Sequence, residues 1–184
     1  MYKKFTILFS DFIDSYYNLT YKTLSMLYWT HYRMSDGRFR PKWVFKCDDD
    51  NFIDIFEFES YLHTLDKLNG ANIICSKREE AVPSRLVSFS KNQNTYITSA
   101  LFTFMKVVNN YLFINVLHST NKNSTWYVDY EMWAEPLWPP CCFGPAYVMT
   151  PEAISKILEV HEAATNPFIP FEDIYVTGQK MSTT

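Results

Sequence analysis

Glycine is scarce in this sequence: only 4 of the 184 residues are glycine, and no two of them lie close together. The two common glycine-rich phosphate-binding loops need clustered glycines, because backbone N–H groups must come close to the phosphate. The sequence therefore excludes nucleotide sites of these two kinds. An excess of positive charge is also missing, since 17 basic residues face 20 acidic ones for a net charge of −3. This balance removes the electrostatic case for a nucleic-acid partner.

Cysteine is also rare, with four residues at positions 47, 75, 141 and 142. These cysteines are few for a disulfide scaffold, and they lack the paired C-x-x-C spacing of a zinc site. A bridge between the adjacent Cys141 and Cys142 would close a strained eight-membered ring. We therefore expect these two cysteines to have separate fates, and the redox compartment stays open.

Long hydrophobic runs are missing as well. Residues 2–9 are too short for a signal peptide and include two lysines. The most apolar region, 100–117, is interrupted by Lys106, Asn109 and Asn110, so it does not meet the requirements of a membrane span. The sequence as given predicts neither an anchor nor an export signal.

The residues that are present indicate one globular domain, because 47% are hydrophobic and only 20% are charged. Strand and helix signals alternate, which predicts an α/β sandwich with ligands at the carboxyl ends of strands. The predicted strands are 5–9, 42–47, 71–76 and 144–150; the predicted helices start at 11–15, 55 and 151 and end near 32, 68 and 164; a further element starts at 172.

Two of the predicted helices have apolar positions at helical spacing, which predicts a buried face on each. The face of the first helix comprises Leu19, Thr23, Met26 or Leu27, and Thr30. The face of the second comprises Ile55, Phe58, Leu62, Leu65 and Leu68, before a stop at Asn69-Gly70.

The composition changes in the middle of the chain. Residues 86–125 contain no Asp, Glu, Gly, Pro, Trp, Cys or Arg, and they favour residues with A/T-rich codons. Residues 87–89 (VSF) are one translation of a 5′ splice-donor sequence. Our hypothesis is that part of the segment 86–122 is a retained intron; the alternative is a genuine insertion that forms a hydrophobic hairpin or helix. Transcript reads that always include the segment would defeat the hypothesis.

The strongest functional signal is three consecutive aspartates, Asp48, Asp49 and Asp50, directly after the predicted strand 42–47. Adjacent like charges repel, so such a run is stable where solvent or a cation screens it. In extended backbone, Asp48 and Asp50 would point to one side and Asp49 to the other. Two carboxylates on one side suit Mg²⁺ or Mn²⁺, which leave positions open for phosphate oxygens. A solvated acidic turn that caps the next helix would explain the triplet alone equally well.

Other motifs accompany the triplet. They are DFIDSYYNLTYKT at 11–23, Trp29, KCDDDNF at 46–52, WYV at 126–128, WPPCCFGPAYV at 138–148 and EDIYV at 172–176. Together and in this order, they resemble the β-1,3-galactosyltransferase-like family of glycosyltransferases (family 31). The resemblance extends over most of the chain, and residues 86–121 are the part without a counterpart.

The resemblance implies a Rossmann-like GT-A fold, incomplete at both ends, in one partial catalytic domain over residues 1–184. It implies an inverting enzyme that moves galactose or an N-acetylhexosamine from a UDP-sugar to a glycan hydroxyl, with a β-1,3 linkage, in protein or lipid glycosylation. Asp48, Asp49 and Asp50 would then hold Mn²⁺ (or Mg²⁺), which neutralises charge on the departing UDP.

Inversion in one step requires a base that takes the proton of the acceptor hydroxyl. By family likeness this base comes from the pair Glu172 and Asp173, and we favour Asp173. A paired carboxylate raises the pKa of one partner, which helps a base. The alternative is that the two acids only mark a helix N-terminus, where the helix dipole favours them.

The resemblance also implies the binding residues. Trp126, Tyr127 and Trp138 would form an aromatic floor for the acceptor sugar, although core packing explains such residues equally well. Residues 144–147 would form a tight turn near the substrate, with Ala146 where the family usually has glycine. The predicted donor- and acceptor-binding residues are Lys46, Trp126, Trp138, Gly144 and Tyr147.

Family members begin with a cytoplasmic tail, a membrane helix and a stem, and their catalytic domains lie in the Golgi lumen. The sequence as given starts after these parts and stops just beyond Asp173. Two hypotheses therefore stay open: a membrane-associated Golgi hexosyltransferase, and a catalytically dead remnant or sugar-binding fragment of one. A third, an unrelated metal-dependent phosphotransferase, is disfavoured by the missing glycine loops.

Two N-glycosylation sequons are present, at Asn18 and Asn123. Asn18 falls in a predicted helix, so Asn123 is the better candidate.

Overall fold

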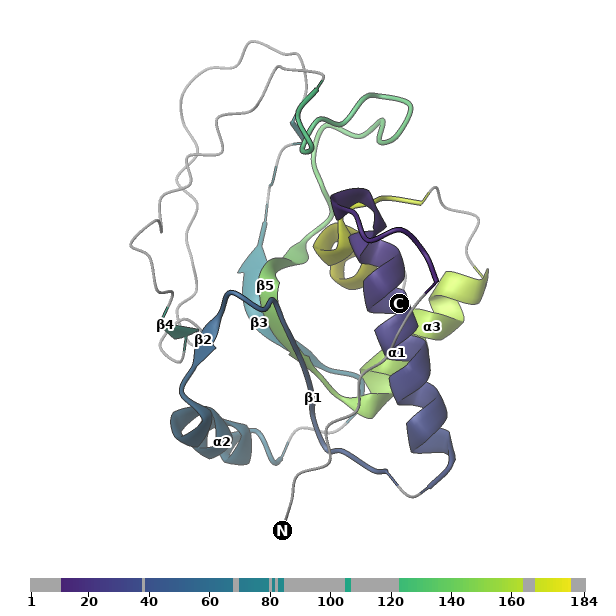
Figure 1. Ribbon diagram of the computed structural model, residues 1–184. Helices are drawn as coiled ribbons and strands as arrows, with labels where there is room; N and C mark the ends of the chain where they lie inside the picture. The colour runs from purple at the N-terminus through teal and green to yellow at the C-terminus, as the bar shows by residue number, and fades with distance from the viewer. Residues whose placement is uncertain are drawn as a thin grey trace.

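The computed structural model describes residues 11–37, 39–67, 70–79, 81, 83–84, 105–106, 123–163 and 168–179. Its main sheet has the strand order β1-β5-β3, formed by β1 (Val44–Cys47), β5 (Cys141–Met149) and β3 (Ile73–Arg78). Both outer strands run antiparallel to β5 and therefore parallel to each other (Figure 1). A second, two-stranded sheet pairs β2 (Phe52–Ile53) with β4 (Met105–Lys106). The predicted mixture of helices and strands is confirmed, with antiparallel pairing in both sheets.

Helices flank the main sheet. The helices α1 (Leu19–Ser35) and α3 (Pro151–Ala163) lie side by side on one side of it, and α2 (Ile55–Thr64) lies on the other (Figure 1). Hydrogen bonds from Tyr28 to Glu162 and between Ser155 and His31 join α1 to α3.

The ends of the helices follow local capping rules. Thr150 caps α3 as predicted, because its hydroxyl accepts a hydrogen bond from the N–H of Ala153. Asp54, outside the aspartate triplet, caps α2 through the N–H groups of Phe56 and Glu57. The prediction for the first helix started too early, because a 3₁₀ turn, η1 (Tyr16–Asn18), precedes α1.

The predicted helix faces are partly confirmed. Thr23, Leu27 and Thr30 are buried, but Met26 is 40% exposed. The prediction for α2 was wrong at Ile55, which is 69% exposed, and none of the residues of α2 is fully buried. The physical reason is that α2 lies at the periphery of the molecule (Figure 1), whereas α1 packs against α3 and the core.

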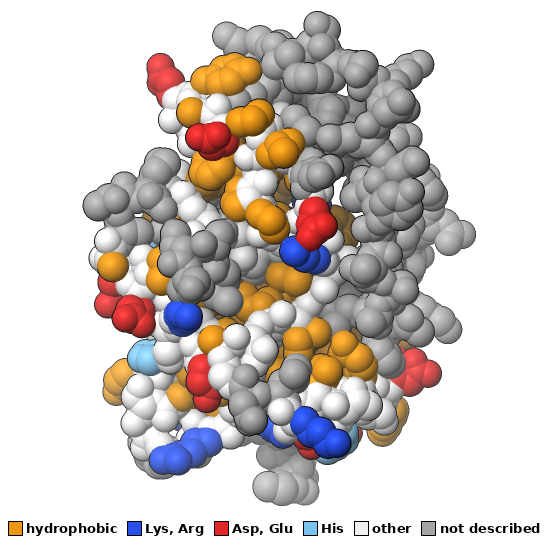
Figure 2. Space-filling model, turned by 180° about the vertical axis from the view of Figure 1, so that it is seen from behind, with side chains coloured by type: hydrophobic (Ala, Val, Ile, Leu, Met, Phe, Trp, Pro, Cys, Tyr) orange, Lys and Arg blue, Asp and Glu red, His pale blue; other side chains and the backbone are white. Residues whose placement is uncertain are grey.

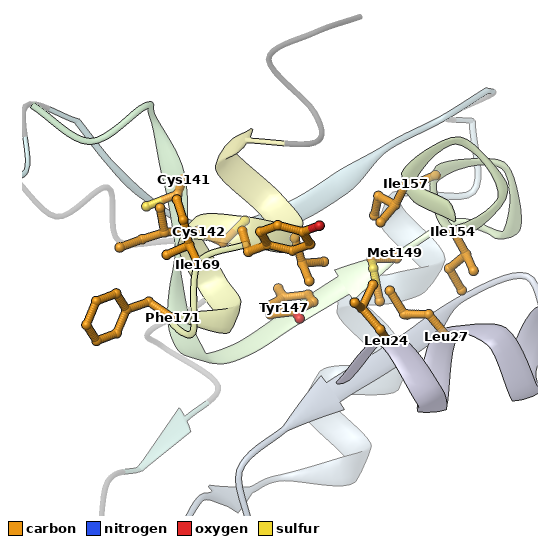
Figure 3. Packing of buried hydrophobic residues seen from close by; sticks show 14 of the residues in the cluster. Leu24, Leu27, Cys141, Cys142, Tyr147, Met149, Ile154, Ile157, Ile169 and Phe171 are labelled. Carbon is orange, nitrogen blue, oxygen red and sulfur yellow. The ribbon is translucent and has the colours of Figure 1, made fainter. Parts of the chain in front are cut away.

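The core lies between β5 and the helices α1 and α3. Figure 3 shows Tyr147 and Met149 of β5 close to Leu24 and Leu27 of α1, with Ile154 and Ile157 of α3 beyond them. Tyr147 and Met149 have no exposed surface. At about 25 cal/mol per Å² of buried apolar area, this central strand contributes strongly to stability.

A break in strand pairing occurs inside β5. Its pairing with β3 passes from Tyr147 directly to Cys142, and its pairing with β1 ends at Ala146. The predicted tight turn at 144–147 is therefore wrong, since these residues form an irregular part of a continuous strand. Proline has no N–H for a ladder, which is the physical reason that Pro145 sits in this break. The predicted strand 144–150 is a longer strand that starts three residues earlier.

The predicted strand 71–76 lies two residues further along the chain, as β3. A disulfide between Cys75 and Cys142 joins it to β5. Cys141 is a buried free thiol, which confirms separate fates for the adjacent cysteines, and Cys47 is free and exposed.

The element predicted to start at 172 is a helical turn that continues as η2 (Ile174–Gln179) and packs against β5. No helix in the described ranges is both long and apolar enough to span a membrane. The predicted strand 5–9 lies outside the described residues, and so does the predicted insertion 86–122 apart from β4.

Candidate active site

The aspartate triplet starts where β1 ends. The Asp48 N–H donates to the carbonyl of Pro145 in the break of β5, at 2.9 Å. Asp49 and Asp50 then form a turn that the Asn51 N–H closes onto the Asp48 carbonyl. The expected alternation of the three side chains is therefore wrong, because it requires extended backbone. Asp49 and Asp50 are exposed, and the Asp48 side chain is 45% exposed.

Lys46 lies beside the triplet with a side chain that is only 12% exposed. Its ammonium group donates to Asp48 Oδ1 at 2.7 Å, to the Gly144 carbonyl at 2.8 Å and to Glu172 Oε1 at 2.8 Å. Burial by itself lowers the pKa of Lys46, but the carboxylates of Glu172 and Asp48 outweigh it and the pKa is raised. Lys46 is therefore a buried cation between the two predicted acidic motifs.

Glu172 is buried, and both of its carboxylate oxygens are engaged. Oε1 accepts from Lys46, and Oε2 accepts from the hydroxyl of Tyr147 at 2.8 Å. Burial raises the pKa of Glu172, while the charge of Lys46 acts in the opposite direction. Tyr147 is fully buried, and burial together with the charge of Glu172 keeps the pKa of its phenol well above the usual value.

The side chain of Asp173 lies next to Gly144. Its Oδ2 is 3.6 Å from Nη1 of Arg78, and its Oδ1 accepts from the Ile174 N–H. Burial raises the pKa of Asp173, partly offset by the charge of Arg78. A Cβ atom on Gly144 would come within 3.2 Å of Asp173 Oδ2, so glycine at this position leaves the carboxylate its space.

An aromatic group borders the carboxylates. The ring of Trp126 stacks on Phe171 with 6.1 Å between centroids and an interplanar angle of 9°, and Tyr16 meets Trp126 edge-on at 4.8 Å. Trp126 is 52% exposed, whereas Trp138 is 7% exposed and packs inside the core against Phe171. Tyr127 is half-buried. Of the predicted aromatic floor, Trp126 thus supplies the accessible surface.

A hydrophobic patch is visible in the space-filling view (Figure 2). Figure 2 shows hydrophobic side chains gathered in the upper part of this face, where residues 123–140 lie. The exposed large side chains of this segment are Trp126, Tyr130 and Leu137.

Two residues of the site were missed by the sequence analysis. Tyr16 lies in the first motif, and burial raises the pKa of its phenol, with added effects of the charges on Asp173 and Asp48. Arg78 ends β3 and lies 5.3 Å from the ring centroid of Phe143. The motif 11–23 contained a signal for Tyr16, but no pattern in the sequence indicated Arg78.

The oxygen donors fit a hard divalent cation that also binds ligand oxygens. Asp49 and Asp50 present carboxylates on an exposed turn, and Asp48 stands next to them. Within the described ranges, no three His, Cys, Asp or Glu side chains converge into a complete metal cage. Such a donor set suits Mg²⁺ or Mn²⁺ held by one or two carboxylates together with substrate phosphates.

The two sequons differ in exposure. The side-chain amide of Asn18 donates to the Ile13 carbonyl at 2.7 Å and is half-buried at the start of α1. Asn123 is exposed, and modification at this site stays a prediction.

The comparisons with known proteins agree with the motifs. The family model described as Galactosyltransferase matches residues 3–184. "Beta-1,3-galactosyltransferase 5" of Pan paniscus is 28% identical over 172 residues, which cover 92% of this chain and 42% of that protein. The rat "UDP-GalNAc:beta-1,3-N-acetylgalactosaminyltransferase 1" is 27% identical over 92% of this chain and 39% of its own length.

A human relative, "Lactosylceramide 1,3-N-acetyl-beta-D-glucosaminyltransferase", is 23% identical over 92% of this chain and 35% of its own length. The chain thus spans about two fifths of the length of the curated relatives it matches. Because the family model extends over nearly the whole sequence, as the ordered motifs do, the chain belongs to the galactosyltransferase family.

Proposed function

We propose that this chain is the catalytic part of an inverting hexosyltransferase that moves galactose or an N-acetylhexosamine from a UDP-sugar to a glycan hydroxyl. One observation carries the proposal: Lys46 connects the aspartate triplet to Glu172, 126 positions away in the sequence. Two acidic motifs that are separate in the chain thus meet at one place. The names of the relatives support a β-1,3 linkage, and the family supports a GT-A fold for the whole enzyme.

Asp173 is the proposed base. It would accept the proton of the acceptor hydroxyl while that oxygen bonds to the anomeric carbon and the bond to UDP breaks. Its raised pKa makes it a stronger base than an ordinary aspartate. Of the two predicted acids, Asp173 also has the more exposed side chain, at 17% against 9% for Glu172.

Asp48, Asp49 and Asp50 are the proposed source of ligands for Mn²⁺ or Mg²⁺, with one or two of their carboxylates binding together with substrate phosphates. When bound, the cation would neutralise the donor diphosphate and the charge on departing UDP. The turn at Asp49 and Asp50 presents both carboxylates to solvent, where a diphosphate has access to them.

The acceptor sugar would lie on Trp126. An exposed indole held rigidly by Phe171 and Tyr16 offers a flat apolar face, which suits the C–H face of a sugar ring. The charge of Asp173 contributes to the raised pKa of Tyr16, so this platform lies within electrostatic range of the proposed base.

We also propose the Golgi lumen as the location and a membrane anchor in the full-length protein, as the family implies. The disulfide between Cys75 and Cys142 supports an oxidising compartment.

The test is hydrolysis and transfer of UDP-galactose and UDP-N-acetylhexosamines by the purified protein, with and without Mn²⁺. We expect Mn²⁺-dependent turnover that is lost in Asp50→Ala and in Asp173→Asn. Calorimetry that detects neither UDP nor Mn²⁺ binding by the folded protein would instead favour a non-catalytic remnant.

A further inference from the structure

We propose that Lys46, Glu172 and Tyr147 form a buried positioning unit, and that none of the three touches a substrate. The unit would fix the position of the aspartate triplet relative to Asp173. This inference deepens the proposed function and rests on it for the roles of Asp48 and Asp173. The contacts within the unit are independent of that function.

The hydrogen-bonding capacity of Lys46 is fully used. A lysine ammonium has three N–H donors and no acceptor. Lys46 has three oxygen partners at 2.7–2.8 Å, namely Asp48, the Gly144 carbonyl and Glu172. No donor is left for a donor-sugar phosphate unless one of these bonds breaks.

Glu172 is equally engaged. One oxygen accepts from Lys46 and the other from Tyr147, and the side chain is 9% exposed. A carboxylate enclosed in this way has no open path to an acceptor hydroxyl. The phenol of Tyr147 comes from the centre of β5, where the ring has no exposed surface (Figure 3).

The unit joins three segments at the place where strand pairing breaks. Lys46 comes from the end of β1, the Gly144 carbonyl from the irregular part of β5, and Glu172 from the helical turn that carries Asp173. Residues 143–146 have no pairing partner in β3. Within this stretch the Gly144 carbonyl accepts a charged hydrogen bond from Lys46, and such bonds are about twice as strong as neutral ones.

The first test measures hydrogen–deuterium exchange and needs no activity. We expect Glu172→Gln and Tyr147→Phe to speed exchange of the peptide 44–52, by about tenfold for Glu172→Gln and less for Tyr147→Phe. Peptides from α1 should exchange at the parental rate. Asp66→Asn is the matched control for Glu172→Gln, because it removes the same negative charge from an exposed ion pair nearby. Unchanged protection of 44–52 in both variants would overturn the proposal.

A double variant distinguishes coupling between the two side chains from simple unfolding of the single variants. Lys46→Met with Glu172→Met removes both charges, and we expect part of the protection lost in Lys46→Met to return. Additive loss would show that the two side chains are not coupled, and the unit would then not exist.

The second test separates positioning from substrate contact. In active protein, we expect Tyr147→Phe and Glu172→Gln to lower kcat by about tenfold while the KM values for donor and acceptor stay within about twofold. A large rise in donor KM for Lys46→Arg, with normal exchange at 44–52, would instead show that Lys46 binds the donor. If no variant or parent has activity but the exchange pattern is as expected, the proposed function fails and the unit stands.

Discussion

Two lysines near β1 form ion pairs of nearly equal length in opposite environments. Lys42 Nζ lies 2.6 Å from Asp66 Oδ1, and the two side chains are 53% and 46% exposed. Lys46 Nζ lies 2.8 Å from Glu172 Oε1, and those side chains are 12% and 9% exposed. Solvent screens the first pair, so it contributes little to stability. The second pair is desolvated, so removal of either partner leaves a buried charge without compensation.

The pKa values of the two carboxylates move in opposite directions. The hydrogen bond from Lys42 lowers the pKa of Asp66, whereas burial raises the pKa of Glu172 in spite of Lys46. A short distance to lysine therefore does not set the sign of the shift; burial does. The chain just before β1, at Lys42, is therefore exposed to solvent. The end of β1, at Lys46, carries the largely buried pair of the candidate site.

The largest difference between the two ends should appear in activity. We expect Asp173→Asn to lower kcat by about 10³-fold, because a general base contributes about 10²–10⁴. Asp66→Asn, the same change at the exposed end, should leave kcat unchanged. Steady-state transfer assays with saturating donor measure both, and equal activity of the two variants would rule out Asp173 as the base.

The second-largest difference between the two ends should appear in the free energy of unfolding. Lys46→Met leaves Glu172 buried without its cation, and we expect a loss of about 3–5 kcal/mol in the free energy of unfolding. Lys42→Met should leave the urea midpoint unchanged within error. Equilibrium urea unfolding, followed by circular dichroism, provides the comparison. Equal midpoints for the two variants would contradict the importance of burial.

Two glycines, one near each of these ends, allow the same comparison to be made for the backbone. Gly144→Ala would push a Cβ to 3.2 Å from Asp173 Oδ2, and we expect kcat to fall by about 10–100-fold through misplacement of the carboxylate. At Gly70, near the exposed end, a Cβ meets nothing within 4 Å but φ is +81°. Gly70→Ala should therefore cost about 1 kcal/mol of stability through backbone strain and leave kcat unchanged. Paired unfolding and rate measurements separate the two effects.

The smallest effect is the pH dependence of stability. A carboxyl group whose pKa is raised on folding stabilises below its unfolded pKa, about 4.3 for Glu, and this contribution is lost as pH rises through the folded pKa. Glu172→Gln should remove that decline. For Asp66 the folded pKa is lowered, so its contribution is present above the unfolded pKa and is lost as pH falls through the folded one. Asp66→Asn should lower stability above the unfolded pKa and make the fall of stability toward acid pH shallower, which urea titrations from acid to neutral pH would reveal.

Some elements of the fold could be predicted from local sequence, and others could not. Local rules placed α3 well, because Thr150, Pro151 and Glu152 determine its start within a single turn. The exposed face of Ile55 could not be predicted, because amphipathic spacing does not tell whether a partner covers the face. The supposed turn at Gly144 and Pro145 failed because these residues stay within β5, where their carbonyls accept hydrogen bonds from the Lys46 ammonium and the Asp48 N–H.

The amino-acid sequence by itself determined the family, the order of the motifs and the identity of the acidic residues, because these depend on residue type and spacing along the chain. Only the tertiary structure decided that Lys46 bridges both motifs, that Glu172 is enclosed, that Arg78 lies beside Asp173 and that Tyr16 packs on Trp126. These contacts join residues far apart in the chain. Their energies depend on burial, which is a property of the packed molecule.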